Sequence, residues 1–175
     1  MTAPAAPAQA AVLTVSDRAA AGALEDSAGP AACALLRRAG FEVGAPDILP
    51  DDPDGIADWL RTCADDGGVA LAVTCGGTGL GPRDRTPQAT EAVLDYRIDG
   101  IAEAMRTASR ALLPSAMLSR GVAGVRGRTL ILNLPGSERA VRENLEVVLP
   151  VLAHAVAQLA GEAEAEPPAG THSAV

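Results

Sequence analysis

The sequence contains no lysine, and all 14 of its basic residues are arginine. A Walker A phosphate loop and Schiff-base chemistry both need a lysine, so both are excluded. The two histidines, His154 in a predicted helix and His172 in a polar tail, are unsuited to a Ser-His-Asp triad or a two-histidine metal site. Carboxylates, arginines, hydroxyls and backbone amides remain, and these groups bind phosphates and magnesium.

Cysteines and aromatic residues are also scarce. Cys33, Cys63 and Cys75 are far apart and form no Cys-x-x-Cys motif, so we expect reduced thiols that fill the core of a cytosolic protein. The net charge is −8 and only 2% of the residues are aromatic. Nucleic-acid binding needs a basic footprint and usually stacking aromatics, so we expect no nucleic-acid partner.

No apolar run reaches the roughly 18 residues that a membrane span needs. The first four residues also lack the charged region of a signal peptide. We therefore expect a soluble, cytoplasmic protein with no membrane partner.

The composition predicts one folded domain between two tails. With 175 residues, of which 48% are apolar, the chain can bury a sizeable core. Residues 1–10 are rich in Ala and Pro and residues 162–175 in Glu, Pro and Gly, so we expect both segments to be disordered and the domain to span residues 11–161.

Within the domain, strand-like and helix-like segments alternate. The pattern predicts strands at 11–15, 41–49, 69–74, 122–125 and 129–134, and helices at 27–39, 53–66, 87–96, 101–110 and 137–160, with a break or kink at Pro150. This alternation is typical of an α/β fold with a mostly parallel sheet covered on both faces by helices.

A glycine-rich loop, from Thr74 to Pro87, follows the apolar run 69–73. Thr86 and Pro87 have the form of a helix start. A strand, a glycine loop and a helix N-terminus together expose backbone N–H groups that favour an anion. The loop therefore resembles a phosphate cradle, although a purely structural glycine turn has the same pattern.

Polar residues follow the other predicted strands as well. Asp17 lies after the first strand and Asp51 after the second, Asp84 closes the glycine loop, and residues 133–137 form a strand-to-helix turn. Ligands of parallel sheets bind beyond the carboxyl ends of the strands, so these groups converge if they share one edge.

Structural readings stand beside the functional ones. Asp52 precedes Pro53 and is equally explained as a helix N-cap, Asp17 with Arg18 as an exposed turn pair, and Asp26 with Ser27 as a cap.

Six ordered blocks carry a family resemblance. They are 14–18, 25–29, 49–51, 74–87, 117–120 and 132–137. Over about residues 11–161 the chain resembles the MoaB/Mog family of molybdenum-cofactor biosynthesis proteins, which is related to the G domain of gephyrin. The resemblance implies a three-layer α/β/α domain that is usually a trimer.

The resemblance also implies an activity, the transfer of AMP from MgATP to the terminal phosphate of molybdopterin with release of pyrophosphate. The family's two functional aspartates match Asp51 and Asp84, to which we assign Mg²⁺. A separate molybdate-inserting enzyme is a possible partner. The candidate substrate- and nucleotide-binding residues are Ser16, Asp17, Thr74, Gly76, Gly77, Thr78, Gly79, Arg83, Ser119, Arg120, Asn133, Pro135, Gly136 and Ser137.

This assignment suits the chemistry. The terminal phosphate of molybdopterin is already an anionic nucleophile, and an aspartate with a pKa of about 3.9 is a poor base. Asp51 and Asp84 are therefore expected to hold Mg²⁺ or position phosphates, and Arg83 to offset negative charge. Arg85 stands where the family commonly has an apolar residue, and is either an extra phosphate contact or a solvated side chain.

Two other functions remain open. One is a binding module that holds molybdopterin without turnover. The other is a dinucleotide-binding oxidoreductase, which the sequence disfavours because the loop lacks a clean Gly-x-Gly-x-x-Gly and no acidic ribose anchor follows about 20 residues later.

Overall fold

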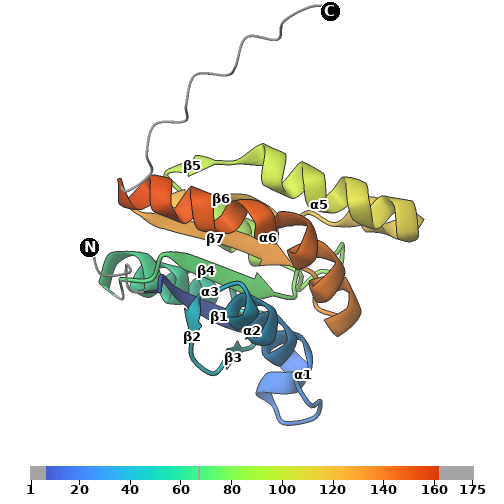
Figure 1. The fold of residues 1–175 in the computed structure, drawn as a ribbon. Helices are drawn as coiled ribbons and strands as arrows, with labels where there is room; N and C mark the ends of the chain where they lie inside the picture. Colours follow the sequence, from blue (N-terminus) through green and yellow to red (C-terminus); the bar gives the residue numbers. More distant parts are fainter. Residues whose placement is uncertain (1–6, 67, 162–175) are drawn as a thin grey trace, which may run out of the picture.

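The computed structural model describes residues 7–66 and 68–161, which form a seven-stranded sheet between two layers of helices. The path through the sheet is β2-β1-β4-β7-β6-β5, and β3 also pairs with β1 (Figure 1). The strands are β1 (Gln9–Val15), β2 (Glu42–Val43), β3 (Asp47–Leu49), β4 (Leu71–Cys75), β5 (Tyr96–Arg97), β6 (Ala123–Arg126) and β7 (Thr129–Leu134). The predicted mostly parallel α/β sandwich is confirmed.

Six α-helices accompany the sheet. They are α1 (Asp17–Ala20), α2 (Ala28–Arg38), α3 (Pro53–Arg61), α4 (Thr86–Glu91), α5 (Asp99–Leu112) and α6 (Glu138–Ala160). A π-helical segment, η1 (Thr62–Asp66), extends α3, and a 3₁₀ helix, η2 (Pro114–Leu118), follows α5. None of the helices in the described ranges is long and apolar enough to cross a bilayer.

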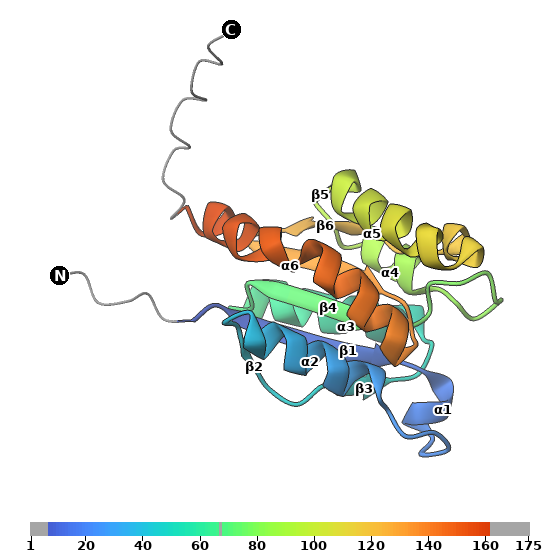
Figure 2. The ribbon, with the colours of Figure 1, turned by 45° about the vertical axis from the view of Figure 1, so that its right-hand side comes forward.

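Successive side chains of a strand point to opposite faces of the sheet. Because helices cover both faces, both sets of side chains are buried. Along β7, Leu130, Leu132 and Leu134 join one hydrophobic cluster with α2 and α6, whereas Ile131 joins a second cluster with α3 and α4. Figure 2 shows α2 and α6 on one side of the sheet and α3 on the other. Cys33, Cys63 and Cys75 are free and buried, as predicted, and burial raises the pKa of Cys63 to about 11.

Several predicted boundaries were wrong. Gln9 and Ala10, expected to be disordered, begin β1 because they pair with β2, and Ala10 also pairs with Leu71 of β4. Pro7 and Ala8, also expected to be disordered, are described, and Ala8 O accepts the Glu42 N–H at 3.0 Å. The disorder predictions for residues 1–6 and 162–175 lie outside the described residues. The single strand expected at 41–49 is two strands, β2 and β3, separated by the segment 44–46, in which Pro46 has no N–H for a ladder.

Two helix predictions also differ from the structure. The helix expected at 87–96 ends at Glu91, and Tyr96 and Arg97 pair instead with β6 as the unpredicted strand β5. The helix α6 runs through Pro150 without the expected break. Pro150 and Glu146, four residues earlier, are both exposed, so the carbonyl that loses its N–H partner is on the solvent side of the helix.

Candidate functional site

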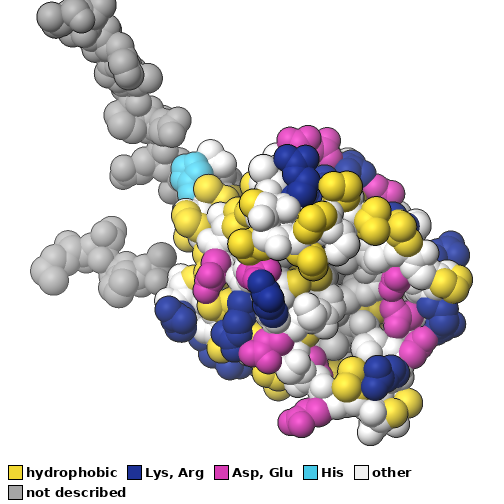
Figure 3. Space-filling view, turned by 90° about the vertical axis from the view of Figure 1, so that its right-hand side faces the viewer, with side chains coloured by type: hydrophobic (Ala, Val, Ile, Leu, Met, Phe, Trp, Pro, Cys, Tyr) yellow, Lys and Arg dark blue, Asp and Glu magenta, His cyan; other side chains and the backbone are white. Residues whose placement is uncertain are grey.

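Four strands bring the predicted site residues to one edge of the sheet. β1, β3, β4 and β7 are parallel and end within one residue of the same level. Val15 pairs with Leu49 and Cys75 with Leu134, whereas Cys75 pairs with Thr14, one residue before the end of β1. Hydrogen bonds from Ser16 N to Leu49 O (2.9 Å) and from Gly76 N to Leu134 O (3.0 Å) continue the pairing beyond the strands. The expectation that these strand ends share one edge is confirmed. Figure 3 views this face, where acidic and arginine side chains surround a hollow.

The glycine loop packs too closely for any side chain at its first two glycines. Gly76 has φ +118°, and a Cβ there would lie 2.2 Å from the carbonyl oxygen of Val15. Gly77 has φ +62°, and a Cβ there would lie 2.2 Å from Thr86 Oγ1 and 3.1 Å from Asp51 Oδ1. The loop backbone therefore lies directly against the end of β1 and beside the Asp51 carboxylate.

A pocket of about 200 Å³ opens between this loop, the end of β1 and the start of α2. Asp51 and Asp84 both line it, although they come from different segments of the chain. Four acidic residues and no arginine are among its lining residues, which are Thr14, Val15, Ser16, Ala19, Leu24, Glu25, Asp26, Ser27, Ala28, Asp51, Cys75, Gly76, Gly77, Asp84 and Gly136. An anionic ligand therefore needs a cation with it to enter this pocket.

Asp51 is held by Asp17. The Asp17 N–H donates to Asp51 Oδ2 and the Asp51 N–H donates to Asp17 Oδ1, each at 3.0 Å. Burial raises the pKa of Asp51, and the neighbouring carboxylates of Asp17 and Asp84 raise it further, against the lowering effects of the Asp17 N–H and Arg83. A bound cation would relieve both penalties, since it favours the charged form.

Asp84 is wrapped by the distal part of the loop. Its Oδ2 accepts the Gly81 N–H at 2.7 Å, and a Cβ on either Gly79 or Gly81 would lie 2.8 Å from that oxygen. Arg120 fastens the loop from outside: its N–H donates to Thr78 O at 2.9 Å, its Nε to Gly79 O at 2.8 Å, and its guanidinium also to Asp84 O. Arg120, predicted to bind substrate, is thus engaged in shaping the loop.

Thr74 and Asn133 lie beneath the site. Asn133 Nδ2 donates to Thr74 Oγ1 at 3.0 Å and to Thr90 Oγ1 at 2.9 Å, and its Oδ1 accepts the Val122 N–H at 3.2 Å. Both side chains are buried and line neither pocket beside the glycine loop. They support the loop from the core. Ser137 caps α6 by accepting the Ala140 N–H.

A second pocket, of about 230 Å³, lies on the other side of the glycine loop. Of the predicted residues, Thr78, Gly79, Ser119 and Pro135 line it. Its other walls come from α5, η2 and α6, including Arg106, Ser109, Leu113, Leu118 and Asn144. Eight of the predicted binding residues are thus divided between two pockets that share the loop. The other six line neither pocket: Asp17, Thr74, Arg83, Arg120, Asn133 and Ser137.

Some pocket residues were missed by the sequence reasoning. Asp26 does act as the expected cap, because its Oδ1 accepts the Ala28 and Gly29 N–H groups, yet its Oδ2 accepts the Thr14 hydroxyl and the residue lines the aspartate pocket. Its position in one of the six family blocks could have identified it. Arg106 and Ser109 had no such signal, because they come from a flanking helix outside every block.

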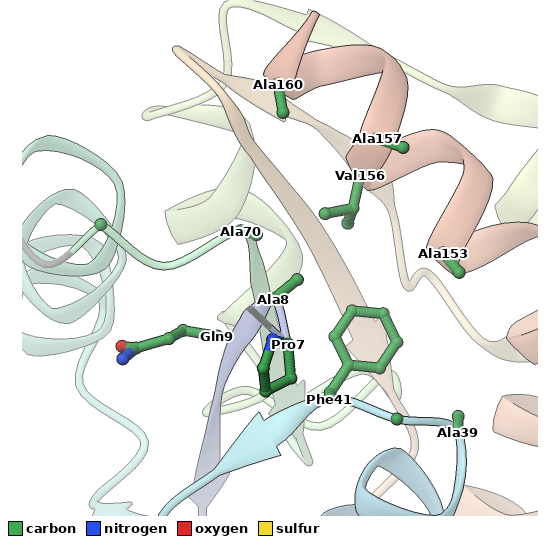
Figure 4. A pocket seen from close by; sticks show the side chains of 12 residues that line it. Pro7, Ala8, Gln9, Ala39, Phe41, Ala70, Ala153, Val156, Ala157 and Ala160 are labelled. Atoms are coloured by element: carbon green, nitrogen blue, oxygen red, sulfur yellow. The ribbon is translucent and has the colours of Figure 1, made fainter. Parts of the chain in front are cut away.

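A larger pocket, of about 410 Å³, lies at the opposite edge of the sheet (Figure 4). Phe41, Ala8 and the C-terminal half of α6, with Val156 and Ala157, enclose it. Among the described residues, no titratable side chain lines it. Although this pocket is the larger of the two, the described residues that line it offer no titratable group for a reaction, and the aspartate pocket remains the candidate active site.

The aspartate pocket fits a magnesium ion only if the substrate completes its coordination. Among the described residues, no group of three or more His, Cys, Asp or Glu side chains is arranged to hold a metal. Mg²⁺ typically takes one or two carboxylates, together with water and substrate phosphate oxygens. Asp51 and Asp84 match that pattern, because they supply two carboxylates in a pocket whose negative charge favours a cation.

Comparison with known proteins identifies the family. Residues 11–154 match the model of a probable molybdopterin binding domain. The chain belongs to this molybdopterin-binding family. It is 41% identical to a molybdopterin adenylyltransferase of Haemophilus influenzae, with 78% of this chain and 71% of the relative covered, and 40% identical to one of Helicobacter pylori, with 86% of both covered.

Family members of known structure share the fold. The MoaB enzyme of Thermus thermophilus is 50% identical, with a TM-score of 0.79 over 87% of this chain and 96% of that one. The Mog protein of Mycobacterium ulcerans is 40% identical, with a TM-score of 0.81 over 87% and 99%. Gephyrin of Dictyostelium discoideum is 38% identical, but the chain spans only 21% of its length.

The close fit at Gly77 leads to a stability prediction. We expect Gly77→Ala to lower the free energy of unfolding by about 1–2 kcal/mol for the left-handed backbone and by about 1–3 kcal/mol more for the clash with Thr86 Oγ1. Gly127→Ala is the matched control, since Gly127 has φ +57° but no atom within 4 Å of its Cβ position. Equal losses in urea unfolding of the two variants would contradict the close contact.

Proposed function

We propose that the protein is a molybdopterin adenylyltransferase. It transfers AMP from MgATP to the terminal phosphate of molybdopterin and releases pyrophosphate, in molybdenum cofactor biosynthesis. The observation that carries the proposal is the meeting of Asp51 and Asp84, from two separate strand-end segments, in one pocket beside the glycine loop. The names of the relatives from Haemophilus and Helicobacter support the same activity.

The reaction needs positioning more than it needs a base. An oxygen of the molybdopterin terminal phosphate attacks the α-phosphorus of ATP, a new P–O bond forms, and the bond to the bridging oxygen breaks so that pyrophosphate leaves with its electron pair. The nucleophile is already an anion, so no proton has to be removed. Asp51 and Asp84 would hold Mg²⁺, and the ion would supply positive charge that offsets the repulsion between the two phosphorylated substrates.

The protein's own part is to fix the oxygens around that charge. Asp51 is oriented by the Asp17 N–H, and Asp84 by the Gly81 N–H. The rigid loop at Gly76 and Gly77 keeps the phosphates at the carboxyl ends of the strands, with no side chain between them and the backbone. Arg83 is largely exposed at the rim, where it pairs with Asp17 and adds positive charge outside the acidic pocket.

The two pockets suit two substrates that must meet. The aspartate pocket takes the reacting phosphates with their cation. The pocket across the loop has apolar walls, including Leu113 and Leu118, with hydroxyls such as Ser119 among them. That combination suits a heterocyclic ring, which needs apolar faces and a few hydrogen-bonding partners at its edges.

The activity is tested by pyrophosphate release from purified protein, molybdopterin and MgATP. We expect Asp51→Asn and Asp84→Asn each to lower the rate at least about 100-fold, because each removes half of the charge that holds the cation. Asp58→Asn is the control, since Asp58 is exposed, lines neither pocket beside the glycine loop and pairs with Arg61. Binding of molybdopterin without pyrophosphate release by the wild type would favour a non-catalytic binding module instead.

The proposal extends to assembly and location. The protein is a cytoplasmic homotrimer that passes its product to a molybdate-inserting enzyme. Support for self-association comes from large apolar side chains exposed together where α5 meets η2, namely Leu112, Leu113, Met117 and Leu118. A surface of this kind is typical of a protein interface. The buried, free cysteines suit a reducing compartment.

Light scattering after size exclusion tests the trimer. We expect a mass three times that of the chain for the wild type, and a shift to the single-chain mass for Leu112→Asp, because a charge there opposes burial of the apolar surface. Val151→Asp, at an exposed position on α6, is the control. A wild type that runs as a single chain would contradict the assembly without touching the proposed chemistry.

A further inference from the structure

Asp17 connects the two aspartates of the site without lining their pocket. Its backbone N–H and one carboxylate oxygen exchange hydrogen bonds with Asp51, at 3.0 Å each. Its carboxylate also receives two hydrogen bonds from the Arg83 guanidinium, from Nε at 2.5 Å and from Nη2 at 2.7 Å. Arg83 is the chain neighbour of Asp84. Asp17 therefore contacts Asp51 directly and is tied to the segment that carries Asp84.

The local sequence explains this geometry. Ser16 ends the run of β1 and caps the short helix α1 by accepting the Ala19 N–H, which places Asp17 at the first helical position. The Ser16 N–H pairs with Leu49 of β3, so Asp17 and Asp51 follow two neighbouring, aligned strands. The two residues can exchange hydrogen bonds because each begins its loop at the same level of the sheet.

The contacts leave the Asp51 carboxylate little freedom to rotate. Its Oδ2 is held by the Asp17 N–H, and its Oδ1 faces Gly77, at 3.1 Å from where a Cβ of that glycine would be. The Asp17 carboxylate itself has no free oxygen, because Oδ1 accepts from Asp51 N and Arg83 Nη2, and Oδ2 accepts from Arg83 Nε. Both oxygens of its side chain are therefore engaged in hydrogen bonds within the protein.

From these contacts we infer that Asp17 is a positioning residue for the transfer reaction: it orients Asp51 and holds the Asp84 loop through Arg83. This inference rests on the proposed function, and it replaces the sequence-based expectation that Asp17 binds the substrate. The pair with Arg83 is exposed, and exposed ion pairs contribute only about 0–1 kcal/mol to stability. Removing Asp17 should therefore change the site far more than it changes the fold.

Two substitutions separate the contacts of Asp17. Asp17→Ala removes the side-chain acceptor of the Asp51 N–H and the pair with Arg83, and it keeps the backbone N–H that binds Asp51 Oδ2. Asp17→Asn keeps an amide oxygen that accepts the Asp51 N–H but loses the charge that pairs with Arg83. Asp65→Ala is the control, because Asp65 also forms a side-chain pair with an arginine, accepting three hydrogen bonds from Arg126, outside both pockets of the site.

Steady-state kinetics give the first test. We expect Asp17→Ala to lower kcat about 10- to 100-fold, as loss of an outer partner of a metal ligand commonly does. We expect it also to raise the Mg²⁺ concentration needed for half-maximal rate, while KM for molybdopterin and MgATP stays within about twofold. Asp17→Asn should recover part of kcat, and Asp65→Ala should match the wild type. A higher KM with unchanged kcat would mean that Asp17 contacts substrate, and would overturn the inference.

Amide hydrogen exchange of the ligand-free protein gives a test that does not depend on activity. We expect the Asp51 amide to lose protection in Asp17→Ala and to keep it in Asp17→Asn, because only the alanine variant lacks the acceptor. Unchanged protection of Asp51 in Asp17→Ala would overturn the inference. A wild type with no turnover would defeat the proposed function, whereas the exchange result would still decide whether Asp17 fixes Asp51.

Discussion

The contact between the glycine loop and the end of β1 is the constraint on which the site depends. Gly76 approaches the Val15 carbonyl so closely that even a methyl group would collide with it, and Gly77 does the same with Thr86. Because the loop backbone occupies this space, the carboxylates of Asp51 and Asp84 come into one pocket. A side chain at either glycine would push the loop outward and separate them. The parallel registers of β1, β3, β4 and β7 make this close approach possible, since they end the four strands within one residue of the same level.

The electrostatics of the pocket follow from the same packing. Acidic side chains enter it from the strand ends and from the start of α2, whereas two nearby arginines form hydrogen bonds with other parts of the protein. Arg83 pairs with Asp17 and Arg120 holds loop carbonyls. These arginines therefore do not neutralise phosphate groups inside the pocket. A divalent cation is the simplest way to balance the negative charge of the phosphates and the carboxylates. Burial and the neighbouring carboxylates raise the pKa of Asp51, which is the cost that a cation would remove.

Local sequence patterns predicted several of the buried strands and helix starts correctly. The apolar runs of β4 and β7 and the caps of α2 and α3 were recognised because buried strands and helix starts have distinct residue preferences. The boundaries that failed depend on partners distant in sequence: Gln9 is a strand residue because Glu42 pairs with it, and Tyr96 because Val125 does. Likewise, Asp51 and Asp84 were found from motifs, but the role of Asp17 is visible only when Arg83, 66 residues away, lies beside it.

The most direct test of the account is a crystal structure with Mn²⁺ in place of Mg²⁺ and a non-hydrolysable ATP analogue, with the metal located by its anomalous scattering. The account predicts one metal that contacts carboxylate oxygens of both Asp51 and Asp84 and at least one phosphate oxygen, at about 2.1 Å. A metal bound to the phosphates with neither aspartate in contact, or a nucleotide seated away from the glycine loop, would contradict it.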